Sequence, residues 1–241
     1  RQYKKWAKFQ IEWRKARNAS IKGIEFPFPY RKGQRELAVS VYRTILRKKK
    51  LFIQAPTGVG KTISTVFPAV KAVGEELGEK IFYLTAKTIT RTVAEQAFET
   101  LREQNLKFKV ITLTAKEKIC FCEETSCNPD DCPYAKGHAV YELLMQEDVM
   151  SREVLEAQAR KHKVCPFEMA LDVSTWVDGV ICDYNYVFDP DARLRRFFAE
   201  GGAGGYLFLI DEAHNLPDRA RAMYSARFSK SSLTEAKRAL G

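Results

Sequence analysis

The chain has 241 residues, of which 45% are hydrophobic, and this is enough apolar material for a substantial core. No apolar run approaches the roughly 18–20 residues of a membrane span, and the basic, aromatic start lacks the apolar stretch of a signal peptide. Forty Lys and Arg against thirty Asp and Glu give a net charge of +10, which suits nucleic acid as a polyanionic partner, although many proteins are basic without binding one.

The N-terminal part of the chain predicts two helices separated by a break. Basic and aromatic residues alternate in 3–17, which favours an amphipathic connecting helix. Pro27 and Pro29 oppose helix in the segment 24–34. Apolar residues then recur every four positions, and this spacing predicts a helix over 35–47.

Short apolar runs alternate with helix-like segments through most of the remaining chain. The expected strands are 51–55, 81–86, 108–114, 179–184 and 206–210. The expected helices are 61–77, 88–103 and one near 190–199, which a glycine-rich turn at 201–205 follows. Pro68 should kink or divide the first of these helices. Nearly continuous apolar strands that alternate with helices predict an α/β fold with a parallel sheet covered on both faces.

The segment APTGVGKT at 55–62 fits a phosphate-binding loop between a strand and a helix. Gly58 and Gly60 let the backbone turn its N–H groups toward phosphate oxygens, and Lys61 can reach the β- and γ-phosphates. The Thr62 hydroxyl can ligate Mg²⁺. The residues expected to contact the nucleotide here are Ala55 (where the usual pattern has Gly), Thr57, Gly58, Val59, Gly60, Lys61 and Thr62.

A second motif, DEAH at 211–214, directly follows the apolar run YLFLI. Asp211 would hold the Mg²⁺ ion and Glu212 would polarise the attacking water. Each motif alone could be a glycine-rich turn or an exposed acidic helix start, but the two in this order predict a RecA-like P-loop NTPase domain. We therefore expect Lys61 and Asp211 to converge at neighbouring strand ends in one Mg²⁺–nucleotide pocket.

Between about 115 and 177 the alternation stops, and five of the six cysteines gather there. Thiolates from an irregular loop can hold Zn²⁺ or an iron–sulfur cluster, and unligated thiols are a third alternative. Three grouped cysteines and a distant one followed by proline favour a 4Fe–4S cluster. The candidate ligands are Cys120, Cys122, Cys127, Cys132 and Cys165, one more than four-ligand binding needs. Cys182 lies in an apolar strand and is expected to be a small buried hydrophobe.

Taken together, residues 26–241 resemble the first motor domain of the XPD/DinG family of superfamily 2 DNA helicases. FPYRKGQ (28–34) resembles the family's adenine-contacting segment, with Gln34 placed to read the base. YLTAKT (83–88) resembles the segment that grips single-stranded DNA, and CDYNYVFDP (182–190) the aromatic-rich stretch before the DEAH strand. The position of the cysteine insertion between the third strand and that stretch is the most specific point of resemblance.

The resemblance implies a 4Fe–4S cluster on Cys120, Cys127, Cys132 and Cys165, with Cys122 as a departure that could replace Cys120. It implies ATP-driven 5′-to-3′ translocation on single-stranded DNA and duplex separation at single-strand/duplex junctions. It assigns His214 to couple γ-phosphate loss to the DNA-bound segments. The residues expected to contact DNA are Thr85, Lys87 and Thr88 at phosphates and Tyr184 or Tyr186 stacking on a base; the two tyrosines could instead cap the sheet.

The expected organisation is a basic helical linker (1–25), a motor domain (26–114 and 178–227), the iron–sulfur insertion (115–177) and the start of an arch-like helical insertion (228–241). The start without Met suggests a piece of a longer cytoplasmic protein, whose second motor domain would supply arginine fingers. Two rivals remain: a zinc-bearing ATPase that acts on RNA, and a non-catalytic DNA- or protein-binding module.

Overall fold

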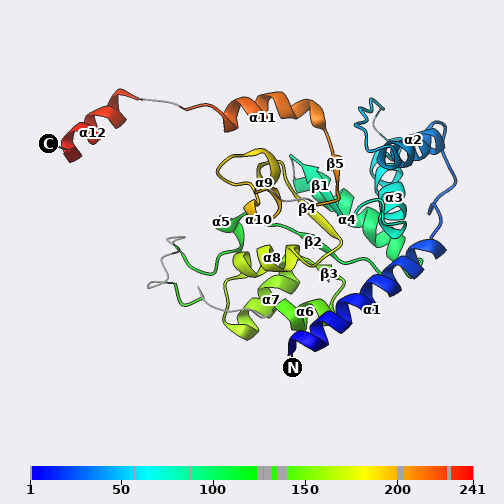
Figure 1. Cartoon of the computed structure of the whole chain (residues 1–241). Coiled ribbons are helices and arrows are strands. Elements are labelled where there is room, and N and C mark those ends of the chain that lie inside the picture. The colour runs from blue at the N-terminus through cyan, green and yellow to red at the C-terminus, as the bar shows by residue number, and fades with distance from the viewer. Residues whose placement is uncertain are drawn as a thin grey trace.

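A parallel five-stranded sheet, with strand order β3-β2-β4-β1-β5, forms the centre of the molecule in the computed structural model (Figure 1). The structure describes residues 2–56, 58–86, 88–123, 127, 132–134, 140–199, 204–226 and 229–240. All strand pairs in it are parallel, which confirms the α/β class. The strands are β1 (Lys80–Thr85), β2 (Val110–Thr112), β3 (Val149–Met150), β4 (Gly179–Asp183) and β5 (Tyr206–Ile210).

Helices surround this sheet and account for most of the described residues. The longer ones are α1 (Gln2–Gly23), α2 (Gln34–Leu46), α3 (Lys61–Gly74), α4 (Thr88–Arg102), α7 (Arg152–His162), α8 (Pro166–Ser174), α11 (Leu216–Met223) and α12 (Lys230–Leu240). The short ones are α5 (Lys116–Ile119), α6 (Val140–Gln146), α9 (Asn185–Phe188), α10 (Arg195–Phe198) and the 3₁₀ turn η1 (Ala213–Asn215).

Two hydrophobic clusters bury the two faces of the sheet. Because side chains alternate along a strand, Phe82 and Leu84 of β1 point to one face while Ile81 and Tyr83 point to the other. The first face packs on residues of α6, α7 and α8. The second face packs on α3 and α4. Burial on both sides explains why the strands are nearly continuous apolar runs in the sequence.

The cysteine-bearing insertion is built into the same sheet and core. Its strand β3 pairs with β2, with Val110 opposite Val149 and Ile111 opposite Met150. Its apolar residues belong to the hydrophobic cluster that contains Phe82. A two-residue strand was not predicted, because two residues carry no readable period. The described part of 115–177 therefore shares its core with the five-stranded sheet.

The expected strand at 51–55 is wrong. Residues 51–56 have no regular secondary structure, and Phe52 is 91% exposed. An apolar run becomes a strand only when a neighbouring strand satisfies its N–H and C=O groups, and this segment pairs with none of the described strands. β5 is an edge strand of the sheet, and its Phe208 is 42% exposed.

Other predicted elements were confirmed with changed bounds. The helices expected at 35–47 and 88–103 correspond to α2 and α4. Pro68 does not divide the helix after the phosphate loop, since α3 runs through it and ends at Gly74. The helix expected near 190–199 is only the four-residue α10. Within the turn expected at 201–205, residues 201–203 lie outside the described residues.

Helix α1 crosses the molecule from the insertion to the helix that follows the phosphate loop (Figure 1). Near its start, Trp6 packs on Tyr141 and Trp176, with ring centroids 4.7 and 5.1 Å apart. At its end, Lys71 of α3 donates its ammonium group to the carbonyl of Ile21 over 2.8 Å. The helix expected at 3–17 is confirmed and is longer, and its contacts make it part of the folded core.

Across the described residues, every helix is too short or too polar to cross a lipid bilayer.

Candidate nucleotide-binding site

The phosphate loop turns into α3 through two glycines in the left-handed region, with φ of 82° at Gly58 and 72° at Gly60. Only glycine adopts these angles without a steric cost. Gly60 is the N-cap of α3, so the unpaired N–H groups of that helix's first turn face the loop. An N-terminus of this kind favours an anion such as phosphate. Thr57 lies outside the described residues.

Gln34 ties the segment before α2 to the phosphate loop. Its side chain is only 4% exposed. The amide oxygen accepts the main-chain N–H of Arg31 over 2.8 Å, and Nε2 donates to the carbonyl of Val59 over 2.7 Å. Arg31 adds a second tie, donating Nη1 to the carbonyl of Gly58 over 2.6 Å. The structure therefore brings the expected adenine-contacting residue against the expected phosphate site.

The structure also brings the phosphate loop and the DEAH segment together. Asp211 follows β5 directly, and its N–H donates to the carbonyl of Leu84 on β1 over 2.9 Å. The charge of Lys61 acts to lower the pKa of Asp211, but burial and then the neighbouring Glu212 outweigh it, so the pKa is raised overall. Lys61 itself donates to the carbonyl of Ala55 over 3.2 Å. Lys61 at the start of α3 thus lies near enough to Asp211 at the end of β5 for its charge to act on that carboxylate.

Tyr83 is the fourth residue of β1 and pairs with Leu209 of β5, two residues before Asp211, and no role at the nucleotide was predicted for it. Its side chain is only 3% exposed and lies on the face of the sheet that α3 covers. Burial is the main cause that raises its pKa, followed by the charge of Asp211. The signal that could have found it is the alternation along β1, which puts Tyr83 on the face that α3 covers.

The remaining DEAH residues are partly or largely exposed. Glu212 has a φ of 51°, an unusual angle for a residue with a side chain, and such angles gather at functional sites. His214 is largely exposed, and its Nε2 lies 3.5 Å from Oε2 of Glu212. The two side chains can therefore act as a pair on a ligand that enters from solvent.

Tyr184 is excluded as a base-stacking residue in this structure. Its side chain has no exposed surface, and its hydroxyl donates to the main-chain carbonyl of Asp211. Tyr184 therefore caps the sheet, which is the alternative to base stacking. Tyr186 is half-buried, and its hydroxyl donates to the carbonyl of Thr114 over 3.3 Å.

The other expected DNA contacts are only partly described. Thr85 is fully buried, with its hydroxyl 2.5 Å from that of Thr90, so it cannot touch a phosphate directly in this arrangement. Lys87 and the side chain of Thr88 lie outside the described residues.

An acidic residue at the end of β4 organises a second group that the sequence analysis did not single out. Asp183 accepts from Arg219 of α11 over 2.7 Å and lies 3.8 Å from Nη2 of Arg91 on α4. Arg219 also donates to Asn185 over 2.8 Å. The signal was present as the polar residues Asp183 and Asn185 at the end of a buried apolar run. This group fixes α11 and α4 against the same edge of the sheet as Asp211.

Cys120, Cys122 and Cys132 lie close together in the first part of the segment 115–177. Sγ of Cys122 lies 4.0 Å from Sγ of Cys132, and Sγ of Cys120 accepts the N–H of Cys122 over 3.4 Å. The pKa of Cys165 is raised, first by burial and to a smaller degree by Cys120. A hydrogen bond with the Cys127 thiol raises the pKa of Lys116. The donors therefore suit a thiophilic metal or cluster, although no three metal-binding side chains within the described part of the chain stand close enough to hold an ion.

Cys182 is fully buried in β4, as expected for a small hydrophobe, and burial raises the pKa of its thiol.

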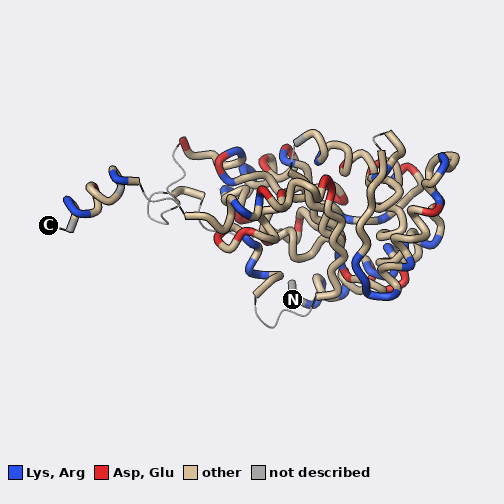
Figure 2. The backbone as a smooth tube through the Cα atoms, turned by 90° about the horizontal axis from the view of Figure 1, so that it is seen from above, with Lys and Arg blue, Asp and Glu red and all other residues tan. Residues whose placement is uncertain are grey.

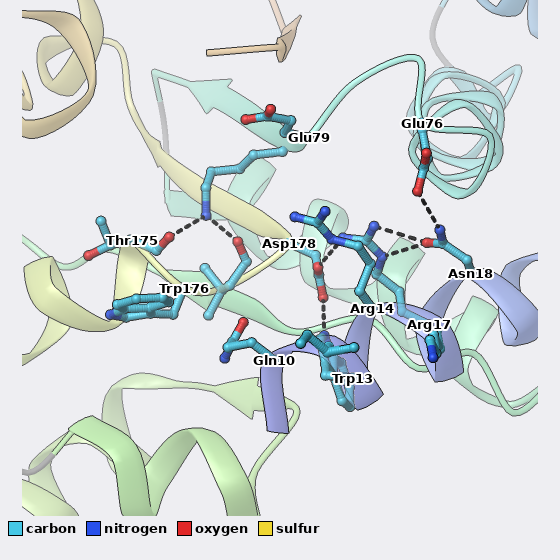
Figure 3. Close-up of a pocket in the computed structure, with 14 residues that line it drawn as sticks. Gln10, Trp13, Arg14, Arg17, Asn18, Glu76, Glu79, Thr175, Trp176 and Asp178 are labelled. Atoms are coloured by element: carbon cyan, nitrogen blue, oxygen red, sulfur yellow. Dashed lines mark hydrogen bonds and ion pairs between the residues drawn. The ribbon is translucent and has the colours of Figure 1, made fainter. Parts of the chain in front are cut away.

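A separate cavity of about 630 Å³ lies between α1 and the beginnings of the strands, at the sheet edge opposite Asp211 (Figure 3). Lys80 is buried there and donates to the carbonyls of Ser174 and Val177. Asp178 accepts from Trp13 over 3.1 Å and from Arg17 over 2.6 Å. These polar groups therefore pair with one another, and their hydrogen bonds hold α1 against the sheet at this cavity.

A parallel sheet, a glycine loop that opens a helix and a carboxylate at the end of β5, beside β1, together define a P-loop nucleotide-binding domain. The chain belongs to the DEAD_2 family, whose model matches residues 85–233. A DEAD/DEAH box helicase model matches residues 35–122.

Individual relatives agree with this assignment. Over 104 residues, 43% of this chain and 8% of the relative, it is 32% identical to a Gallus gallus Fanconi anemia group J protein homolog. It is 22% identical to the Homo sapiens regulator of telomere elongation helicase 1 over 253 residues, 80% of this chain and 20% of that protein. The fold matches a truncated XPD structure with a TM-score of 0.58 at 20% identity, covering 83% of this chain and 58% of that one. The chain thus spans only a small part of the length of these curated relatives.

Proposed function

We propose that this chain is the first motor domain of an ATP-dependent DNA helicase. The observation that carries the proposal is that the glycine loop opens α3, which packs on β1, while Asp211 at the end of β5 donates its N–H to Leu84 of β1 over 2.9 Å. A phosphate loop and a strand-end carboxylate are the groups that bind the phosphates and Mg²⁺ in a P-loop ATPase. In this proposal Gln34 contacts the adenine, Glu212 activates water, and His214 links hydrolysis to DNA. A second motor domain would complete the ATP cleft.

The basic balance of the chain supports single-stranded DNA as the substrate, and Figure 2 shows Lys and Arg positions spread along the described backbone. We propose Lys87, Thr88 and Tyr186 as the contacts, because the structure takes Tyr184 and Thr85 out of direct reach. Translocation from 5′ to 3′ and action at single-strand/duplex junctions are inferred from the family resemblance. The cytoplasmic location expected for an enzyme that uses ATP stays a prediction.

For the insertion, we propose a 4Fe–4S cluster on Cys120, Cys127, Cys132 and Cys165. Such a cluster supplies metal–thiolate bonds that pin a loop-rich segment. One observation favours zinc as the alternative: the 4.0 Å between the sulfurs of Cys122 and Cys132 is close to the roughly 3.8 Å between two thiolates on one Zn²⁺ with 2.3 Å bonds. Iron and zinc analysis of anaerobically purified protein decides between them, and Cys132→Ser should remove the visible absorption of a cluster.

Nucleotide binding by the isolated chain tests the central proposal. Mg²⁺–ATP should bind to the chain, and Lys61→Ala and Asp211→Asn should each weaken it strongly, while turnover stays low even with single-stranded DNA. Arginine fingers contribute about 10³–10⁵ in rate in other NTPases, so a chain without them should turn over slowly. Vigorous ATP hydrolysis would contradict the dependence on a second motor domain, and undetectable nucleotide binding would contradict the site itself.

A further inference from the structure

The positive charge of the chain is concentrated on helix α1. Its 22 residues contain seven Lys and Arg against one Glu, a net charge of +6, whereas the whole chain of 241 residues has a net charge of +10. Charge that serves solubility alone is usually mixed in sign and spread over a surface. One helix with more than half of the net charge therefore indicates a more specific use.

Four lysines of α1 share one side of the helix. Lys4, Lys8, Lys15 and Lys22 follow one another at intervals of four, seven and seven residues. With about 100° of rotation and about 1.5 Å of rise per residue, they fall within an arc of about 40° and extend over about 27 Å. All four are exposed. We refer to these four residues as the lysine stripe.

The opposite side of α1 is buried against the rest of the molecule. Trp6 and Arg17 lie roughly half a turn from the lysine stripe and are only 5% and 7% exposed. Trp6 packs on Trp176 with ring centroids 5.1 Å apart, and Arg17 donates to Asp178 over 2.6 Å. These contacts fix the rotation of α1, which runs along the periphery of the molecule, so the lysine stripe is held toward solvent (Figure 1).

Carboxylates compensate the charge of the lysine stripe only weakly. Glu12 is the one acidic residue of α1, and its carboxylate lies 3.7 Å from the ammonium group of Lys8, with side chains 64% and 78% exposed. An ion pair this exposed is weak, so Lys8 remains open to another anion. Glu76 comes close to α1 at Asn18, whose amide it accepts over 3.4 Å. The other three lysines form no ion pair with a carboxylate among the described residues.

A straight row of ammonium groups matches a straight polyanion such as duplex DNA. The duplex carries one negative charge per about 1.7 Å of its axis, and its persistence length of about 500 Å keeps it straight over the length of the lysine stripe. Single strands are commonly bound through aromatic rings that stack on bases as well as through positive charge. Trp6 is buried and Phe9 and Trp13 are half-buried, so none of the described rings of α1 is exposed for stacking.

An anionic lipid surface is the other polyanion that basic helices bind. Such a helix inserts its apolar side at the level of the lipid headgroups. The apolar side of α1 is packed within the protein, since Trp6 and Ile21 are only 5% and 1% exposed. A lipid surface could attract the lysine stripe by charge alone, so duplex DNA is the better match.

We propose that the lysine stripe binds the phosphate backbone of duplex DNA without regard to base sequence. A lysine contacts a phosphate as a point charge, and backbone contacts carry no direct sequence information. This inference goes beyond the proposed ATPase site, because α1 contacts Asp178 directly before β4, whereas Asp211 follows the end of β5. The duplex is therefore held at the opposite edge of the sheet from the nucleotide.

The salt dependence of duplex binding tests the proposal. A fluorescein-labelled duplex of about 20 bp is titrated with the chain, without nucleotide, and followed by fluorescence anisotropy at several salt concentrations. Each neutralised phosphate contributes about −0.9 to the slope of log affinity against log salt concentration. A variant that combines Lys4→Gln, Lys8→Gln, Lys15→Gln and Lys22→Gln should therefore reduce the magnitude of this slope by about 3 to 4. Four such contacts also account for a fall in affinity of about 100-fold between about 50 and 200 mM salt, which the variant should lose.

Two further variants serve as controls. A variant with Lys49→Gln, Lys50→Gln, Lys230→Gln and Lys237→Gln lowers the net charge equally at exposed lysines outside α1, and it should change the slope by less than about 1. Changing the four lysines of the stripe to Arg keeps the charge and should preserve the affinity of the parent. Gln and Arg have helix propensities close to that of Lys, and melting curves establish that each variant is folded.

Each outcome supports or overturns the proposal. A parental slope and duplex affinity in the folded stripe-to-Gln variant overturn it, and so does an equal loss in both Gln variants, since that reports net charge alone. The same titrations are made with a single strand of about 20 nucleotides and with anionic lipid vesicles. A loss for either that equals or exceeds the loss for the duplex overturns the choice of duplex DNA. Mg²⁺–ATP binding is measured separately, and its absence in the parent would contradict the ATPase site alone.

Discussion

The side-chain amide of Gln34 donates to the main-chain carbonyl of Val59 over 2.7 Å, so the first residue of α2 holds the phosphate loop before any nucleotide arrives. Gln34→Ala should weaken nucleotide binding about fivefold to tenfold, because it leaves the Arg31 N–H and the Val59 carbonyl without this partner, at a cost of about 1–1.5 kcal/mol. Ser40→Ala, an exposed change on the same helix, is the control. If calorimetric titration gave the same nucleotide affinity for the parent and Gln34→Ala, the hydrogen bond from Gln34 to Val59 would not be needed to hold the loop.

Gly60 should tolerate no side chain. Its φ of +72° already disfavours any L residue, and an added Cβ would lie 2.4 Å from Nε2 of Gln34. Gly60→Ala should therefore displace Gln34 and reduce nucleotide affinity by more than Gln34→Ala does. Gly23→Ala is the control, since a Cβ there meets no atom within 4 Å. A Gly60→Ala protein that binds nucleotide like the parent would show that the loop relaxes without using this contact.

The buried pair of Arg17 and Asp178 should contribute strongly to stability. The pair is 2.6 Å apart with both side chains under a tenth exposed, and removing one partner of such a pair costs about 3–5 kcal/mol. Arg17→Ala should lower the free energy of unfolding by an amount of that order in urea titrations. Arg221→Ala, which breaks the exposed pair with Asp218, should change it by less than about 0.5 kcal/mol. Similar losses in both variants would refute the importance of burial.

Lys80 should make stability rise with pH in the alkaline range. Burial lowers the pKa of Lys80 to about 8 from 10.5, so between these values the unfolded chain binds a proton that the folded chain does not. The free energy of unfolding should therefore increase from about pH 8 to pH 10.5, by up to about 3 kcal/mol from this group, and its contribution should be constant below pH 8.

Lys80→Met removes this titration. The difference in unfolding free energy between the parent and this variant should therefore increase with pH over the same range. Lys107→Met, at an exposed lysine, should leave the slope in place. A parallel pH dependence in the parent and Lys80→Met would show that Lys80 keeps an ordinary pKa in the folded chain.

Local sequence patterns were sufficient for the parts of the fold that local chemistry decides. The apolar run of β1 and the apolar periodicity of α2 could be read directly, and so could the glycines that begin α3, because only glycine accepts their angles. The segment 51–55 failed for the opposite reason. Its apolar residues are typical of a strand. A strand forms, however, only where a neighbouring strand pairs with it, and the sequence of the segment does not specify such a neighbour.

The residues of the candidate site likewise fall into those that local sequence predicts and those that it does not. Lys61 and Asp211 belong to motifs whose spacing carries their chemistry, so they could be named in advance. Tyr83 could not be placed beside the two motifs in advance, since its position depends on which face of β1 it occupies and on what α3 and β5 bring to that face. The burial of Tyr184 likewise depends on tertiary packing, which no stretch of aromatic letters reveals.

Helix α1 meets the insertion through Trp6 near its first turn and α3 through Ile21 near its last, with the Arg17–Asp178 pair between them. A rod anchored at three points cannot swing. A force applied near the start of α1 is therefore transmitted to the part of the molecule that carries the phosphate loop, so the helix and that part move as one body.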